Sequence, residues 1–562
     1  MRNLAFSAFT AIAYWSRWNF LRKTHRMDEV QEKFLRSLLQ THQDTAFGRE
    51  YGFADIQTID QFRERIPVQS YQAFEPYTQR MANGEPNVLV ADPLIYFNIS
   101  SGSTGTKKLI PVTKRSRRVL ARSNRTAAGF GVAAAARQNR PLGEFLYPIS
   151  ANSHGITPSG IPYAPVSTSD ARLTDRLSRQ VFAHPFETFE IADTPARYYA
   201  CLLFALRNRQ LRVIGATFPV LALQMCDRLS EYSESLIDDL EKGTIASWLP
   251  IDGDSQDIRS RLEPKLSPHP QRAAELRQIV QKYGHLTPKH AWPHLSFIVT
   301  ARGGTSNFYF QKFPEYFGDT PIFGGTYSCA EGVLGIHHDL NDDTCLPAME
   351  STFLEFIPQD QWDAEFPKTI LPTEAQVGER YRVVFSNYSG FYRYDLGDII
   401  EVTGFYNQAP LFTFLHRQGN VMSSSTEKTT EAHVVEVMRR LQEEFQISLE
   451  NFCITLSKDA APAHYLVNIE LASRQSHLSH PKQFLQRFDE VMKEVQKFYA
   501  IKRHDQIPLP RLRIMAPGSF ERLRQRMLQQ GVAESQLKFP HLTEDRNWLD
   551  GLPVLEEVRL EE

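Results

Sequence analysis

The spacing of apolar residues predicts several core-facing helices in the first half of the chain. Between Met27 and Thr45, apolar side chains recur every three or four residues, which is the period of one helix face. Residues 196–244 carry the same period through a series of leucines. Residues 60–67 predict a short helix that ends before Pro67, because proline cannot continue a helix.

Short apolar runs alternate with these helical stretches and predict strands. They lie at residues 297–299, 322–323 and 381–385. Strands interleaved with helices favour an α/β fold in which helices flank the sheets, with a sheet that is at least partly parallel.

The pattern changes after about residue 418, where a second series of elements begins. This tail of about 140 residues is long enough to form its own core. The sequence therefore predicts a large N-terminal domain over residues 1–417 and a small α+β domain over residues 418–562. The elements predicted in the small domain are strands over residues 453–456, 465–471 and 511–515, and helices over residues 484–498 and 520–529.

The first twenty residues are unusually apolar for the start of a chain. The run Leu4–Ala13 is continued by Tyr14, Trp15 and Trp18. Its end resembles a signal-peptidase site, but only one basic residue precedes the run and polar residues interrupt it. We expect an amphipathic first helix that docks on the main body, on a partner or on a membrane surface, with a cleaved signal as the alternative.

Composition excludes several classes of function. The chain has 562 residues, of which 42% are hydrophobic and 23% charged, an ordinary composition for a globular protein. Its formal net charge of −2 provides no positive potential that would attract nucleic acid. Its five cysteines form no CxxC pair and no metal-binding spacing with histidine, which favours a reducing compartment. No apolar stretch approaches the ~20 residues needed to span a bilayer. We expect a cytoplasmic monomer or weak homodimer, and the composition favours neither nucleic-acid binding nor membrane association.

A strand followed by a loop of small residues is the first candidate site. The apolar run 94–99 leads into hydroxyl residues and glycines, and Lys108 follows them. Glycines let backbone N–H groups approach an anion, hydroxyls donate further hydrogen bonds, and lysine supplies counter-charge, so the segment suits polyphosphate. The glycine spacing differs from that of a P-loop, and a plain surface loop is the alternative. The loop residues are Ser100, Ser101, Gly102, Ser103, Thr104 and Gly105.

The glycine-rich segment 324–332 is the second candidate. Tyr327 can lay its ring against a purine, and Glu331 can coordinate Mg²⁺ that bridges phosphate oxygens. A glycine-rich turn with an exposed glutamate is the alternative.

Two further segments carry polar residues that suit a nucleotide. Asp398 follows a glycine and can accept two hydrogen bonds from ribose hydroxyls, although a Gly-Asp turn between strands is common. Arg417 lies just before Gly419 at the predicted domain boundary, which suggests a hinge beside a nucleotide, and a surface arginine is the alternative. Lys428 can add positive charge near the phosphates.

Together these segments resemble the GH3 family of acyl acid–amido synthetases within the adenylate-forming superfamily. The resemblance covers nearly the whole chain, and Lys538 in the segment Gln536–Pro540 is similar to a family lysine brought into the site by domain rotation. Cys329 and Ala330 replace two family serines, and Asp395 stands where plant members usually carry arginine. The matching segments are residues 62–68, 76–85, 100–108, 327–331, 392–398, 428–429 and 536–540.

The resemblance implies a large adenylate-forming domain and a small mobile domain that rotates about residues 417–420. It implies that ATP and Mg²⁺ activate a carboxylic acid as an acyl-adenylate, and that an amine, in particular an amino acid, then takes the acyl group. Thr326, Tyr327 and Asp398 would hold the adenosine, whereas Lys108, Glu331, Lys428 and Lys538 would be catalytic.

Two other functions remain open at this stage. The same adenylation step serves ligases that pass the acyl group to the thiol of CoA or of a carrier protein. A binding protein that keeps the fold without turnover is the third possibility, although it would have no need of the charged residues named above. The sequence does not reveal the acid or the acceptor.

Overall fold

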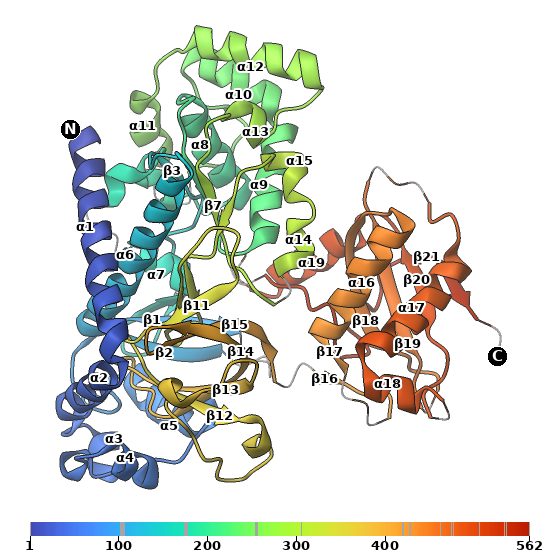
Figure 1. The fold of residues 1–562 in the computed structure, drawn as a ribbon. Coiled ribbons are helices and arrows are strands. Elements are labelled where there is room, and N and C mark those ends of the chain that lie inside the picture. The colour runs from blue at the N-terminus through green and yellow to red at the C-terminus, as the bar shows by residue number, and fades with distance from the viewer. Residues whose placement is uncertain are drawn as a thin grey trace. The chain divides into compact units, whose positions relative to one another are not determined.

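The computed structural model describes residues 2–560 except 102–106, 173–177, 253–256, 305, 419–420, 426, 428, 461, 474, 476, 505, 533 and 535–536. The chain divides into two compact units (Figure 1). Unit 1 contains Met1–Leu396 and Ile400–Phe414, and unit 2 contains Gly397–Ile399 and Leu415–Glu562. No helix in the described part of the chain is both long and apolar enough to cross a bilayer.

Helices form the start of unit 1. The helix predicted from Met27 is confirmed and ends at His42. A new helix begins a few residues later, where the Thr45 side chain caps it by accepting a hydrogen bond from the Gly48 N–H. The helix predicted to stop before Pro67 is also confirmed, and it begins with a capping box on Thr58. These helices are α1 (Arg2–Lys23), α2 (Met27–His42), α3 (Ala46–Glu50), α4 (Ile59–Arg65) and α5 (Tyr71–Ala82).

A parallel sheet with the order β3-β6-β7-β8 lies among the helices of unit 1. The predicted strands 297–299 and 322–323 are confirmed as β7 and β8. The sequence pattern did not predict β6, because its three residues lie inside the stretch 196–244, whose apolar residues follow a helical period. The strands are β3 (Phe145–Leu146), β6 (Val213–Gly215), β7 (Phe297–Val299) and β8 (Ile322–Phe323). The remaining α-helices of unit 1 are α6 (Lys114–Arg137), α7 (Val166–Arg172), α8 (Thr194–Leu206), α9 (Pro219–Glu231), α10 (Ser233–Lys242), α11 (Ile258–Leu262), α12 (Pro270–Tyr283), α13 (Pro288–Ala291), α14 (Ser306–Phe310) and α15 (Phe313–Phe317).

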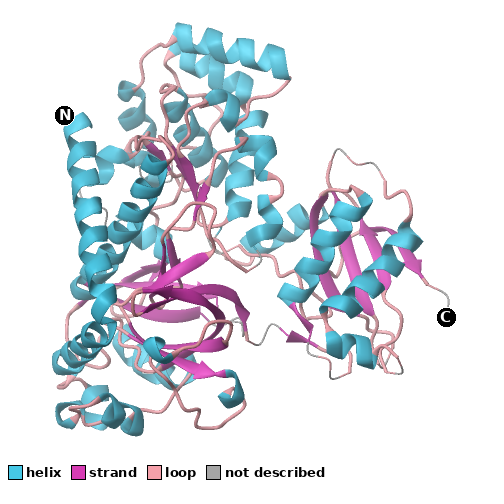
Figure 2. Cartoon of the chain, viewed as in Figure 1, coloured by secondary structure: helices cyan, strands magenta, loops and turns pink. Residues whose placement is uncertain are grey.

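Two further sheets gather at one end of unit 1, away from α10 and α12 (Figure 2). One has the order β12-β13-β14-β15-β11-β10-β9 and the other the order β2-β1-β5-β4. The predicted strand 381–385 is confirmed within β13. The strands of the first are β9 (Thr326–Ser328), β10 (Val333–His337), β11 (Thr344–Pro347), β12 (Phe353–Pro358), β13 (Arg380–Ser386), β14 (Tyr394–Tyr406) and β15 (Ala409–Arg417). Those of the second are β1 (Leu94–Ser101), β2 (Lys107–Thr113), β4 (Gly155–Ile156) and β5 (Pro162–Ala164).

A buried carboxylate ties the N-terminal helices to these sheets. Glu355 on β12 is fully buried and lies 3.0 Å from Arg63 Nε and 3.1 Å from Arg393 Nε. Arg393 has a φ of 47° and donates further hydrogen bonds to the backbone carbonyls of Arg63 and Ile66. A buried charge is tolerated only when it is paired and hydrogen-bonded. Two of the motif segments, 62–68 and 392–398, therefore meet at a structural joint.

Unit 2 is built around the sheet β18-β19-β20-β21. The strands predicted at residues 465–471 and 511–515 are confirmed, and the strand predicted at 453–456 begins earlier, at Leu449. Sequence analysis missed β21, an edge strand whose charged residues hide its period. The strands of unit 2 as a whole are β16 (Val421–Met422), β17 (Thr429–Thr430), β18 (Leu449–Leu456), β19 (Tyr465–Leu471), β20 (Arg511–Met515) and β21 (Val554–Arg559). The helices are α16 (Glu431–Phe445), α17 (Pro481–Val495), α18 (Lys497–Lys502) and α19 (Ser519–Gln529).

Candidate active site

The β1–β2 hairpin fixes both ends of the predicted phosphate loop. In its antiparallel register Ser100 lies opposite Lys108, and β1 ends at Ser101. Gly102, Ser103, Thr104 and Gly105 lie outside the described residues. The hairpin therefore holds Lys108 at the base of the loop, beside the residues that enter it.

Glu331 lies in the turn of the β9–β10 hairpin. The turn is closed by paired backbone hydrogen bonds between Cys329 and Gly332, with Ala330 and Glu331 at its centre. Turn residues are normally exposed, yet Glu331 is only 3% exposed. The Asn387 side chain donates to the Glu331 carbonyl at 2.7 Å, and a Cβ on Gly332 would lie 2.5 Å from that amide nitrogen. The glycine thus lets Asn387 hold the turn inward.

A tyrosine hydroxyl joins the two charged residues of the site. The Tyr394 hydroxyl donates to Glu331 Oε1 at 2.9 Å, and Lys108 Nζ donates to the Tyr394 hydroxyl at 3.3 Å. Lys108 Nζ also lies 3.8 Å from Glu331 Oε1. At such a separation opposite unit charges attract by about 4 kcal/mol at the effective dielectric constant typical near a protein surface. This attraction and the hydroxyl offset the cost of burying the Glu331 carboxylate.

Lys108 is held from a second side by Tyr71 on α5. Its ammonium lies 5.3 Å from the centre of the Tyr71 ring, within the range of a cation–π contact. The Tyr71 hydroxyl accepts a hydrogen bond from the Leu109 N–H at 2.7 Å, so the ring is anchored to β2 itself. Burial, more than the nearby carboxylates, raises the pKa of Tyr71, so the hydroxyl stays protonated. The lysine head is therefore positioned by contacts on two sides.

Thr326 and Tyr327 lie on β9, in the same hairpin as Glu331. The Tyr327 ring is half-buried and lies 5.4 Å from the Phe414 ring, inclined to it by 32°. Two glycines precede this strand for steric reasons, because a Cβ on Gly324 would lie 2.3 Å from the His337 ring and Gly325 has a φ of 66°.

Asp398 and Arg417 form an ion pair within unit 2. Asp398 is 2% exposed, and Arg417 Nε donates to its Oδ1 at 2.7 Å. The preceding Gly397 has a φ of 82°, and its carbonyl accepts from the Gln418 N–H at 2.6 Å. This backbone hydrogen bond ties the two segments together. The Asp398 carboxylate, which was predicted to accept hydrogen bonds from a ribose, is bound here by the Arg417 guanidinium.

Lys538 is exposed on a firmly anchored segment of unit 2. Leu537 and Phe539 on either side of it are buried. The His541 N–H donates to Glu431 Oε1 at 2.6 Å, and the His541 ring stacks on Phe452 at 4.3 Å. Burial lowers the pKa of His541, and the positive charge of Lys538 adds to the shift. Lys428 lies outside the described residues.

The structure brings together groups that sequence analysis did not connect. The motif Tyr392–Asp398 was noted for Asp398, whereas the Tyr394 hydroxyl is the group that reaches Glu331. A signal existed in the sequence, because Tyr394 belongs to that motif, but spacing along the chain does not reveal where a side chain points. Asp395 lies 3.0 Å from Arg382 Nε, so the departure at this position has a charge partner of its own.

The described residues contain no group of three or more histidine, cysteine, aspartate or glutamate side chains that could enclose a metal ion. Mg²⁺ in nucleotide sites commonly takes one or two carboxylates and completes its coordination with phosphates and water. A single buried carboxylate beside the loop, Glu331, fits that mode of binding.

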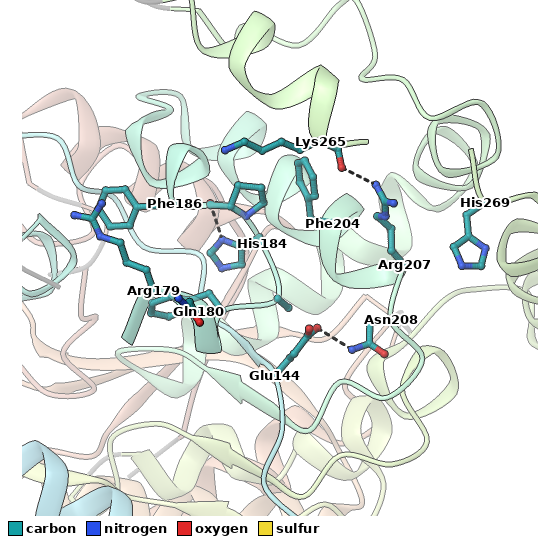
Figure 3. A pocket seen from close by; sticks show the side chains of 13 residues that line it. Glu144, Arg179, Gln180, His184, Phe186, Phe204, Arg207, Asn208, Lys265 and His269 are labelled. Carbon is teal, nitrogen blue, oxygen red and sulfur yellow. Dashed lines mark hydrogen bonds between the residues drawn. The ribbon is translucent and has the colours of Figure 1, made fainter. Parts of the chain in front are cut away.

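A cavity of about 760 Å³ lies elsewhere in unit 1 (Figure 3). Among the described residues its lining includes none of the predicted site residues, and several of its polar groups pair with their neighbours. Asn208 donates to Glu144, and Arg207 donates to the Lys265 carbonyl. The chemistry of Lys108 and Glu331, and not the size of this cavity, identifies the candidate site.

Three family models match consecutive parts of the chain. The GH3 family N-terminal domain matches residues 17–322, the GH3 family central domain residues 345–417, and the GH3 family C-terminal domain residues 432–547. The first of them spans more than half of the 562 residues.

Two plant proteins are similar over nearly the whole length. The chain is 27% identical over 555 residues to indole-3-acetic acid-amido synthetase GH3.4 of Arabidopsis thaliana, covering 92% of this chain and 89% of that protein. It is 26% identical over 560 residues to 4-substituted benzoates-glutamate ligase GH3.12 of the same plant, covering 92% of this chain and 93% of that protein.

Solved structures share the fold. GH3.15 acyl acid amido synthetase superposes with a TM-score of 0.82 at 23% identity, covering 95% of both chains. A 2-hydroxyisobutyryl-CoA ligase in the postadenylation state superposes with a TM-score of 0.55 at 12% identity, covering 92% of this chain and 90% of the other. These similarities confirm the predicted fold class, a large α/β domain followed by a smaller C-terminal one.

Proposed function

Because the chain belongs to the GH3 family, we propose that it is an ATP-dependent acyl acid–amido synthetase. It adenylates a carboxylic acid with release of pyrophosphate and passes the acyl group to an amine, in particular to an amino acid. The observation that carries the proposal is the cluster of Lys108, Tyr394 and Glu331 at the base of a glycine- and serine-rich loop. Relatives that conjugate acids through amide bonds support the same reaction class.

In the first half-reaction a carboxylate oxygen of the acid attacks the α-phosphorus of ATP, and the bond to pyrophosphate breaks. Backbone N–H groups and hydroxyls of residues 100–105 hold the phosphates, and Lys108 supplies positive charge. The protein mainly positions the reactants and neutralises charge. Mg²⁺ bound by Glu331 would offset the charge that develops on the phosphate oxygens.

The adenosine is held by residues from two segments. Tyr327 stacks on the purine, Thr326 donates or accepts beside it, and Asp398 accepts from the ribose hydroxyls. In this role Arg417 releases or shares the Asp398 carboxylate that it binds in the structure.

In the second half-reaction the amine nitrogen attacks the acyl carbon, the bond to AMP breaks, and the amine loses a proton. We place the domain boundary at residue 417, with residues 1–417 in the large domain, 418–562 in the mobile domain and the hinge at 417–420. Rotation of the small domain would bring Lys428 and Lys538 to the acyl-adenylate and exclude water. The protein acts as a monomer or weak homodimer.

The test is pyrophosphate release with ATP, Mg²⁺ and a panel of carboxylic acids, with and without amino acids or CoA. Acid-dependent release that amino acids accelerate, with an amide found by mass spectrometry, is the expected result. Acceleration by CoA alone would assign the protein to the thiol ligases, whose fold it shares. If none of the acids in the panel causes pyrophosphate release, the result would point to a binding protein without turnover.

The variant Glu331→Gln keeps the side-chain volume and removes the charge. We expect pyrophosphate release to fall by about a hundredfold, which is typical for the loss of one charge-stabilising group. Glu365→Gln is the matched control, because Glu365 is exposed, and it should leave the rate unchanged. Equal rates in the two variants would remove Glu331 as the metal ligand.

A further inference from the structure

Helix α1 exposes an apolar surface where a surface helix normally carries polar residues. Its inner side packs on α6, with Phe20 buried 6.0 Å from Phe130 (Figure 1). On the opposite side the exposed fractions are 63% for Trp15, 53% for Trp18 and 43% for Ile12. Adjacent exposed apolar side chains on a protein surface commonly mark a site of contact with a protein or a membrane. The outward face of α1 is therefore expected to meet another apolar phase.

This face is an aligned stripe and not a scatter of single residues. Trp15 and Trp18 are separated by three positions, and Ala11 and Arg22 extend the same row by one turn at each end. All four are exposed. The Arg22 guanidinium lies 4.8 Å from the centre of the Trp18 ring, a cation–π contact at the edge of the stripe. Tryptophan beside arginine is the combination that anchors helices at membrane–water interfaces.

Helices α1 and α6, which pack on each other, are strongly cationic. Helices α1 and α6 together contain eleven lysines and arginines and no aspartate or glutamate, in a chain of net charge −2. Some of the cations pair with carboxylates of neighbouring elements, whereas Lys114, Arg118 and Arg125 are exposed along one face of α6. A local field of this sign attracts an anionic surface.

We propose that the outer face of α1 docks on the surface of an anionic lipid bilayer, with Trp15 and Trp18 in the headgroup region. A second copy of this chain is disfavoured as the occupant, because it would bring two cationic faces together. Nucleic acid is disfavoured because the exposed apolar side chains of Ile12, Trp15 and Trp18 offer phosphates nothing to bind. The proposal does not depend on the reaction that the protein catalyses, and it concerns a surface contact, since no described helix can cross a bilayer.

The test is co-sedimentation of the full chain with vesicles of phosphatidylcholine alone or with about 30% phosphatidylglycerol. We expect binding to the anionic vesicles only, and weaker binding when NaCl is raised from about 50 mM to about 500 mM. The double variant Trp15→Ser/Trp18→Ser should lower the partition coefficient about tenfold or more. Trp248→Ser is the matched control, because Trp248 is 56% exposed and lies outside α1, and it should bind as the wild type does.

A second variant guards against misfolding of the first. Arg22→Gln/Arg118→Gln removes two exposed charges without touching the core and should also weaken binding to anionic vesicles. Absence of vesicle binding, equal binding to neutral vesicles, or unchanged binding in both double variants would overturn the proposal. A wild-type dimer, detected by light scattering and lost in the tryptophan variant, would identify a second copy as the occupant and overturn it equally.

Discussion

The hydroxyl of Tyr394 offers the sharpest test of the candidate site, because the variant Tyr394→Phe removes this group and nothing else. The side chain is 1% exposed, and its hydroxyl donates to Glu331 Oε1 at 2.9 Å. A hydrogen bond to a charged group contributes about 1.5–3 kcal/mol, and removal of one partner leaves a buried carboxylate less well satisfied. We therefore expect the free energy of unfolding of unit 1 to fall by about 2 kcal/mol.

Tyr392 provides a matched control within the same motif. It is also buried, but its hydroxyl donates to the neutral carbonyl of Leu89 at 3.0 Å. Tyr392→Phe should cost only about 1 kcal/mol. Urea unfolding followed by tryptophan fluorescence measures both values, and a pyrophosphate assay measures the rate. Tyr394→Phe should slow acid-dependent release, whereas Tyr392→Phe should not.

A double-mutant cycle identifies the partner of the hydroxyl. If Tyr394 acts on the Glu331 charge, the loss caused by Tyr394→Phe should shrink by about 1 kcal/mol in the Glu331→Gln background. Fully additive losses would refute the coupling and with it the role assigned to the hydroxyl.

Three further predictions follow from single groups. Glu355→Gln removes the carboxylate shared by Arg63 and Arg393 and should lower the free energy of unfolding, measured in urea, by about 3–5 kcal/mol. Asp60 is exposed beside Arg63, and Asp60→Asn should change the free energy of unfolding by less than about 0.5 kcal/mol. Similar values for the two variants would contradict the structural role assigned to the buried Glu355. Burial lowers the pKa of His42 from 6.5 to about 4, so between these pH values the ring is neutral in the folded protein and protonated in the unfolded chain. The free energy of unfolding should therefore fall by about 1.4 kcal/mol per pH unit for this group as the pH drops from 6.5 towards 4. In His42→Asn the urea midpoint should depend less on pH between pH 7 and 5. Lys538→Ala should slow amide formation more than pyrophosphate release in the coupled assay, and an equal effect on both would place Lys538 outside the second half-reaction.

The sequence alone determined the type of those elements that have a clear apolar pattern, and it indicated the family. Strands 297–299, 322–323, 465–471 and 511–515 were predicted at their observed bounds, because isolated apolar runs between polar residues leave little choice. The family resemblance, confirmed by the family models, rests on motifs whose residue types suit phosphate and nucleotide chemistry. The short strand β6 was not predicted, because it lies within a long stretch whose apolar residues follow a helical period.

Only the tertiary structure decided which side chains meet. Lys108, Glu331 and Tyr394 are separated by up to 286 positions, and their contacts depend on the pairing of distant strands, which local periodicity does not encode. The same holds for the exposed stripe of α1, since the apolar pattern of that helix does not tell which side is buried until α6 packs against it. Periodicity is a property of neighbours along the chain, whereas a site and a docking face are properties of neighbours in space.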